Sequence, residues 1–182
     1  VLSDGLINFP NSTRLLFARA MLNNERQRLP ATERDLRQIL KQDSNNVAAL
    51  NSLGYILADR TQRYSEAYEL LEKALRLKPD DAAIIDSMGW LYYRTGKYPE
   101  ALDYLRQAYE ASPNAEIGAH LGEVLWVIGD QEEAHRVWRE ALRIDRASGR
   151  VGFPAGSVQI ESHLFTSDGV LTPPAWARLV AA

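Results

Sequence analysis

A spacing of about 34 residues between small side chains is the feature that most constrains the fold of this chain. Gly54, Gly89 and Gly122 are separated by 35 and then 33 residues. Two sets of alanines keep the same spacing, namely Ala67, Ala101 and Ala134, and Ala74, Ala108 and Ala141. Several independent markers at one period indicate a repeat architecture, in which each unit is one supersecondary motif.

The unit is best seen in residues 82–114, which are predicted to form two short amphipathic helices joined by a tight turn. Ile85, Met88 and Tyr92 recur at intervals of three and four, so they share one helical face. Gly96 marks the turn. A hairpin of this size cannot bury its own apolar face, so it needs copies on both sides. The predicted fold is therefore all-α, a right-handed superhelix of stacked helix-turn-helix units.

These markers resemble the pattern of the tetratricopeptide repeat, which places Leu-Gly, Tyr, Ala, an aromatic or Leu, Ala and Pro at set positions. The pattern runs as Leu53-Gly54, Leu57, Ala67, Leu71, Ala74 and Pro79, then as Met88-Gly89, Tyr92, Ala101, Leu105, Ala108 and Pro113, and then as Leu121-Gly122, Leu125, Ala134, Trp138 and Ala141. The resemblance implies an α-solenoid that holds proteins or peptides and has no common chemistry. Trp138 is expected in the core.

The period divides the chain into segments. Residues 1–12 are interpreted as the end of a truncated preceding repeat, which makes the chain the C-terminal part of a longer repeat protein. Four repeats are predicted at 13–46, 47–81, 82–114 and 115–146. The first repeat is degenerate, since Arg19, Ala20 and Thr32 take slots that hold Leu, Gly and Ala elsewhere. Residues 147–182 form a Gly- and Pro-containing tail, predicted to be extended or folded back.

Composition argues against several functions. The net charge of −3 provides no basic excess to neutralise phosphates, so nucleic acid is not an expected partner. No membrane-spanning run of apolar residues occurs. The three histidines lack ligand spacing, and neither a phosphate loop nor a nucleophile elbow is present. We therefore expect no metal, no cofactor and no enzymatic activity.

The first helix of each repeat is predicted to turn one face towards a concave groove floored by aromatic rings. Rings with nearby polar groups are typical of binding hot spots. The alternative is that Trp90 and Trp126 simply pack between repeats. If the groove binds a partner, replacing both tryptophans by alanine is expected to abolish binding without unfolding the chain. The predicted groove residues are Asn51, Tyr55, Asp59, Asp86, Trp90, Tyr93, Arg94, His120, Glu123 and Trp126.

A closer resemblance lies in phrases such as Asp86-Ser87-Met88-Gly89-Trp90 and His120-Leu121-Gly122-Glu123. They look like the C-terminal half of proteobacterial outer-membrane tetratricopeptide lipoproteins, which act as adaptors of a carboxyl-terminal processing protease. The resemblance implies a periplasmic scaffold, anchored by a lipid upstream of this chain, with the protease or its substrates as partners. A cytoplasmic location stays open. The alternative function is a self-assembly module whose tail packs in its own or a neighbour's groove.

Overall fold

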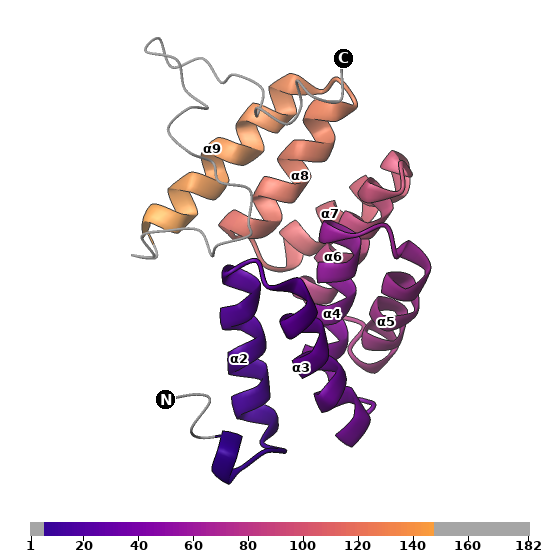
Figure 1. Ribbon diagram of the computed structural model, residues 1–182. Coiled ribbons are helices and arrows are strands. Elements are labelled where there is room, and N and C mark those ends of the chain that lie inside the picture. Colours follow the sequence, from indigo (N-terminus) through magenta and orange to yellow (C-terminus); the bar gives the residue numbers. More distant parts are fainter. Residues whose placement is uncertain (1–5, 148–182) are drawn as a thin grey trace.

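The computed structural model describes residues 6–147, which are helical apart from short connections (Figure 1). Residues 6–8 are helical, and eight longer helices follow. In chain order these are α2 (Thr13–Glu25), α3 (Leu29–Gln42), α4 (Val47–Arg60), α5 (Tyr64–Leu77), α6 (Ala82–Arg94), α7 (Tyr98–Ala111), α8 (Ala115–Val127) and α9 (Gln131–Ala147). The predictions for residues 1–5 and for the tail from residue 148 onward lie outside the described residues, and the repeat boundaries stay predictions.

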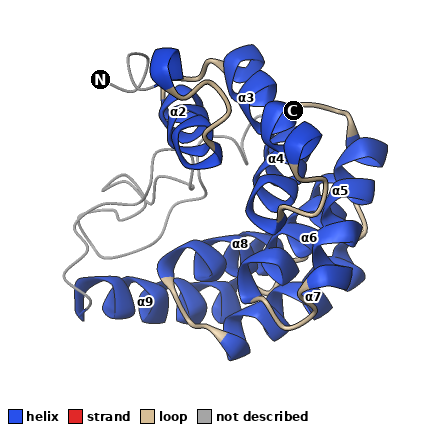
Figure 2. Cartoon of the chain, turned by 90° about the horizontal axis from the view of Figure 1, so that it is seen from below, coloured by secondary structure: helices blue, strands red, loops and turns tan. Residues whose placement is uncertain are grey.

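The helices form pairs that stack in series. Each even-numbered helix packs most extensively against the helix that follows it, and α4 also packs against α6, as α6 does against α8. Figure 2 shows the result as an arc in which α2 and α8 belong to opposite arms. The predicted all-α solenoid of stacked hairpins is confirmed. Among residues 6–147, none of the helices combines the length and the hydropathy that a membrane span requires.

The first helix of every pair, called the inner helix below, begins at a polar cap, whereas the second helices form the outer layer. The side chains of Ser12, Asn46, Asp81 and Asn114 accept hydrogen bonds from backbone N–H groups in the first turns of α2, α4, α6 and α8. Such caps satisfy N–H groups that have no partner within the helix. Because the caps recur once per repeat, they fix where each inner helix starts.

Glycine allows the two helices of a pair to approach each other closely. A Cβ atom at Gly89 would lie 2.7 Å from Cγ of Leu105, and one at Gly122 would lie 2.1 Å from Nε1 of Trp138. The repeated alanines also belong to the core, since Ala67, Ala101 and Ala134, and Ala74, Ala108 and Ala141, are all 0% exposed. The predicted core position of Trp138 is confirmed, since its side chain is 4% exposed.

The degenerate first pair replaces part of this apolar contact by an ion pair. Arg19 of α2 donates from Nε and Nη2 to the two carboxylate oxygens of Asp35 on α3, at 2.7 and 2.8 Å. Asp35 is only 1% exposed, and the guanidinium satisfies it with two parallel hydrogen bonds. Thr32 fills an alanine slot at 0% exposure by donating its hydroxyl to the carbonyl of Arg28. The hairpin is therefore kept although its markers are absent.

Candidate functional site

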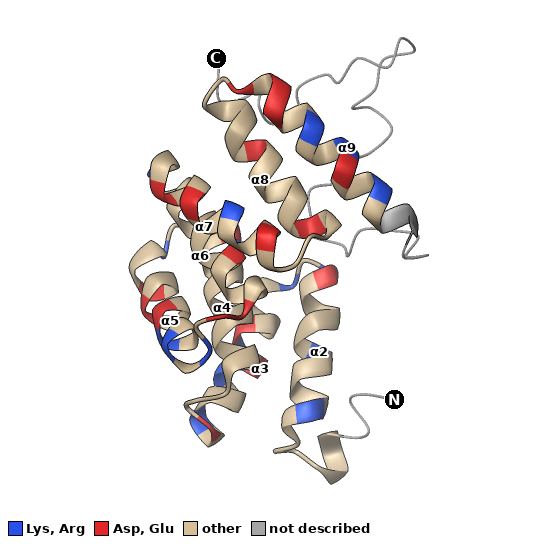
Figure 3. Ribbon diagram, turned by 180° about the vertical axis from the view of Figure 1, so that it is seen from behind, with Lys and Arg blue, Asp and Glu red and all other residues tan. Residues whose placement is uncertain are grey.

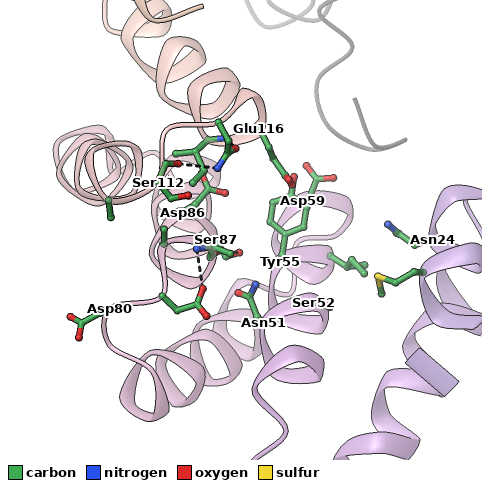
Figure 4. Close-up of a pocket in the computed structure, with 18 of the residues that line it drawn as sticks. Asn24, Asn51, Ser52, Tyr55, Asp59, Asp80, Asp86, Ser87, Ser112 and Glu116 are labelled. Atoms are coloured by element: carbon green, nitrogen blue, oxygen red, sulfur yellow. Dashed lines mark hydrogen bonds between the residues drawn. The ribbon is translucent and has the colours of Figure 1, made fainter. Parts of the chain in front are cut away.

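A pocket of about 660 Å³ opens on the concave side of the arc, where four inner helices contribute to its walls (Figure 4). Figure 4 shows Asn24 of α2 facing Tyr55 and Asn51 of α4 across this space. Four of the ten predicted groove residues line the pocket, namely Asn51, Tyr55, Asp59 and Asp86. The pocket also includes Asn24, Glu116 and several residues before α6 and α8, among them Asp80, Asp81, Ser112 and Asn114.

Trp90 does not line this pocket, so the prediction that its ring forms part of an aromatic groove is corrected. The side chain is 4% exposed and lies between α4 and α8. Its ring stacks on that of His120 with centroids 4.2 Å apart, and its Nε1–H donates to Oδ1 of Asp59 at 3.1 Å. Stacking and burial hold the indole in the contact between repeats, which was the alternative interpretation.

Trp126 is half-buried and packs towards α9 rather than towards the pocket. Its ring lies 5.4 Å from that of His135 and 5.9 Å from that of Trp138, with interplanar angles of 28° in both cases. The aromatic residues predicted for one groove thus divide between two packing clusters. Replacing Trp90 and Trp126 together would remove buried core, so the expectation that the double variant stays folded is withdrawn.

His120 and Asp86 form the centre of the packing cluster behind the pocket. The Nδ1–H of His120 donates to both carboxylate oxygens of Asp86, at 2.9 Å each, and Nε2 lies 3.2 Å from the hydroxyl of Tyr55. His120 is 1% exposed and Asp86 is 4% exposed. Three successive inner helices, α4, α6 and α8, therefore meet at one histidine ring.

Two further predicted residues extend this cluster, and both remain half-buried. Arg94 donates from Nη1 to the backbone carbonyl and to Oδ1 of Asp59, the latter at 3.2 Å. Tyr93 lies beside Trp90, with ring centroids 4.9 Å apart, and its side chain interacts with that of Glu123. Glu123 is 5% exposed, and its second oxygen, Oε2, has no hydrogen-bond partner among the described residues.

The surroundings shift the pKa values of these buried groups. Burial disfavours the charged form of His120, but the adjacent Asp86 carboxylate outweighs this and raises the pKa of His120 to about 9. Burial raises the pKa of Glu123 to about 7, against the opposing effects of Tyr93 and His120. Burial also raises the pKa of Tyr55 well above its ordinary value. At neutral pH the histidine is therefore a cation paired with Asp86.

This protonation state decides what the cluster can do. A histidine that keeps both protons cannot take one from a hydroxyl, so the Asp86–His120–Tyr55 chain is not poised as a general base. The neighbouring Ser87 hydroxyl donates to the carbonyl of Ala83, at 2.9 Å. Within the described part of the chain, no group of three His, Asp or Glu side chains is arranged to hold a metal ion. The arrangement holds three repeats together and gives the pocket a fixed wall.

The pocket itself is rich in hydrogen-bond acceptors. Asp59, Asp80 and Glu116 contribute carboxylates, whereas Arg60 is the basic residue among its described lining residues. The side-chain oxygens of Asn24 and Asn51 are buried and have no hydrogen-bond partner among the described residues. Figure 3 shows acidic but no basic positions along α8, consistent with its sequence. Sequence periodicity did not point to Asp80 or Ser112, because both lie in connections outside the helical pattern.

Comparison with known proteins agrees with this geometry. Two sequence models described as tetratricopeptide repeat match residues 45–114 and 87–149. TPR repeat-containing protein PA4667 of Pseudomonas aeruginosa is 51% identical over 122 residues, which is 67% of this chain and 21% of that protein. Bacteriophage adsorption protein A of Escherichia coli K12 is 33% identical over 100 residues, covering 55% of this chain and 10% of that protein. The chain thus spans about a fifth or less of these two relatives.

Solved structures share the fold at low sequence identity. The thermophilic tetratricopeptide protein TTC0263 of Thermus thermophilus superimposes with a TM-score of 0.70 at 19% identity, covering 81% of this chain and 86% of that one. PilW, a type IV pilus biogenesis factor, gives a TM-score of 0.69 at 18% identity, covering 82% of this chain and 76% of that one. The repeat markers, the stacked hairpins and the two matching models, which together extend from residue 45 to residue 149, lead to one conclusion. The chain belongs to the tetratricopeptide-repeat family.

Proposed function

We propose that the chain is a binding module that holds a segment of a partner polypeptide against its concave surface. The observation that carries this proposal is the pocket of about 660 Å³, whose walls come from four successive inner helices. A ligand that contacts all four must extend along the solenoid, as a peptide or a helix does. Proteins of this family generally mediate protein–protein interactions, which favours the same function.

The packing cluster behind the pocket supports binding by preorganisation. The ion pair between His120 and Asp86 and the indole of Trp90 fix α4, α6 and α8 relative to one another. A wall that is already ordered loses little conformational entropy when a ligand arrives. The pocket therefore keeps its shape without a partner, and affinity depends on the residues that face into it.

The finer proposal is that the bound protein is a carboxyl-terminal processing protease or one of its substrates, which makes the chain part of an adaptor. Its support is the resemblance of the α6 and α8 sequences to outer-membrane tetratricopeptide lipoproteins. The periplasm is the location proposed with it, with a lipid anchor upstream of this chain. The identity of 51% with PA4667 extends over 122 residues, although that protein's name states only the repeat.

The test uses one bulky substitution at two sites. Ser52 lines the pocket from α4, whereas Ser65 is exposed on α5 of the outer layer and is not among the pocket residues. Ser52→Trp should weaken binding of the purified protease from the same organism by at least about tenfold in biolayer interferometry, and Ser65→Trp should leave it unchanged. Equal binding by both variants would contradict the concave site.

The same samples distinguish the general proposal, a concave binding site, from the specific one, an adaptor role for the protease. Absence of protease binding by the unmodified chain would remove the adaptor role, and the photo-crosslinking described in the Discussion would then test the concave site alone. Light scattering on the chain with and without residues 150–182 reports self-association, the second function predicted from the sequence. A dimer that forms only when these residues are present would favour that alternative.

A further inference from the structure

We propose that the concave pocket takes an arginine side chain of the partner polypeptide. This inference rests on the proposed function and names the chemistry of the group that the pocket recognises. It follows from three properties of the lining: unsatisfied amide oxygens, an excess of carboxylates, and an aromatic ring at the pocket wall.

Two amide oxygens of the pocket lining lack a hydrogen-bond donor within the described residues. Oδ1 of Asn24 and Oδ1 of Asn51 are buried and have no hydrogen-bond partner among the described residues. Both residues line the pocket, from α2 and α4 respectively. A buried acceptor without a donor is unfavourable, so a small rotation of either side chain towards the N–H groups of a ligand would satisfy it. A guanidinium carries five N–H donors and no acceptor, which matches a lining of this kind.

The carboxylates then select for positive charge. Glu116 and Asp80 line the pocket, are exposed and form no salt bridge within the described residues. Oδ1 of Asp59 already accepts hydrogen bonds from Trp90 and Arg94, and Nε of Arg60 lies 3.8 Å from its Oδ2. The lining holds five carboxylates in all, at Asp59, Asp80, Asp81, Asp86 and Glu116. Even when His120, Arg60 and Arg94 are counted against them, the site retains a net negative charge.

The aromatic ring favours arginine over lysine. Tyr55 lines the pocket between Asn51 and Asp59 on α4, and the face of a tyrosine ring attracts a cation placed over it. A guanidinium is planar, stacks on such rings and is more weakly hydrated than an ammonium. A lysine side chain would satisfy the charge but fewer of the acceptors.

The experiment uses a minimal probe, acetyl-arginine-methylamide, and its neutral isostere, acetyl-citrulline-methylamide. Two-dimensional NMR on the full chain should show millimolar binding of the arginine probe, with shifts of the side-chain amide signals of Asn24 and Asn51. The citrulline probe should produce no comparable shifts. Equal shifts with both probes, or shifts confined to residues outside the pocket, would overturn the inference, as would stronger binding of acetyl-lysine-methylamide, the ammonium counterpart.

Matched variants localise the effect. Glu116→Gln should weaken binding of the arginine probe about threefold, because it removes one unpaired carboxylate from the pocket rim. Glu69→Gln makes the same change at an exposed position on α5 and should have no effect. Asn51→Leu should abolish the shift at Asn24 while the rest of the spectrum remains folded. Unchanged probe binding in both Glu116→Gln and Asn51→Leu would contradict the assignment.

Failure of this inference can be told apart from failure of the proposed function. If Ser52→Trp still weakens partner binding while the arginine and citrulline probes are indistinguishable, the pocket holds the partner through another group. The concave binding module then stands, and the arginine assignment falls.

Discussion

Nδ1 of His120 lies 2.9 Å from each of the two carboxylate oxygens of Asp86, and this contact ties α8 to α6 across 34 residues of sequence. Both side chains are buried, so neither charge is shared with water. The ring of His120 also stacks on Trp90 and reaches the hydroxyl of Tyr55. A single histidine therefore couples three repeats of a solenoid whose units otherwise contact mainly their neighbours.

Removing the carboxylate should strongly destabilise the array. Asp86→Ala leaves His120 either charged without a partner or neutral in a site built for the cation, and breaking a buried pair in this way costs about 3–5 kcal/mol. Urea unfolding followed by circular dichroism measures the loss. Asp103→Ala, on the exposed face of α7, should change the free energy of unfolding by less than about 0.5 kcal/mol. Similar losses in the two variants would show that the ion pair contributes little.

Stability should fall as the pH rises from weakly acid to alkaline. The folded chain raises the pKa of His120 from 6.5 to about 9 and that of Glu123 from 4.5 to about 7, so it binds both protons more tightly than the unfolded chain. The contribution of Glu123 is then lost between about pH 4.5 and about pH 7, and that of His120 between about pH 6.5 and about pH 9.

Urea midpoints measured from about pH 6 to about pH 9.5 test this pH dependence. The midpoint of the unmodified chain should decrease over that range, and the decrease should be smaller in His120→Gln, which cannot gain or lose this proton. A midpoint that rises with pH over the same range would contradict the assignment of a charged histidine.

The contact between α8 and α9 leaves no room for one methyl group. Gly122→Ala would place Cβ 2.1 Å from Nε1 of Trp138 and 2.5 Å from its Cδ1, and the indole is held by a hydrogen bond to the carbonyl of Ala119. Overpacking of this kind costs about 1–3 kcal/mol. Thermal unfolding should show the loss together with a changed Trp fluorescence. An unchanged melting temperature would mean that α9 shifts freely.

The two inner-face tryptophans should differ in their effect on stability. Trp90→Ala removes a ring that is 4% exposed, stacked on His120 and bonded to Asp59, and should cost about 3–5 kcal/mol. Trp126 is half-buried, so Trp126→Ala should cost clearly less. Chemical denaturation of the two single variants decides this, and the reverse order of stability would contradict the burial of Trp90.

The solenoid could be predicted from the sequence because close contacts between helices require small residues at regularly spaced positions. Gly54, Gly89 and Gly122 each face a side chain of the following helix that a Cβ would strike, so only glycine fits and the period becomes visible. The degenerate first hairpin, where Arg19 and Asp35 replace this contact, shows that the fold survives without the marker. In that hairpin, the pairing of the two helices could be inferred only from the period set by the following repeats.

The candidate site was predicted less well, because periodicity tells which face a residue occupies but not what covers it. Trp90 takes the same slot as Tyr55 and Glu123, one residue after the glycine, yet it is sealed by a histidine of the next repeat. That histidine has no equivalent in the preceding repeats, so its contact with Asp86 carries no repeated signal. Asn51, Tyr55 and Asp59 line the pocket, although Tyr55 also contacts His120 and Asp59 also accepts a hydrogen bond from Trp90.

The central claim is that the concave wall formed by α2, α4, α6 and α8 holds a partner polypeptide. Site-specific photo-crosslinking tests it most directly, with p-benzoylphenylalanine introduced at Ser52 in the pocket or at Ser65 on the outer layer, and the products identified by mass spectrometry. The account predicts a discrete protein adduct from position 52, with crosslinked residues close to an arginine of the partner, and none from position 65. Adducts that arise from position 65 and not from position 52 would place binding on the convex side and contradict it.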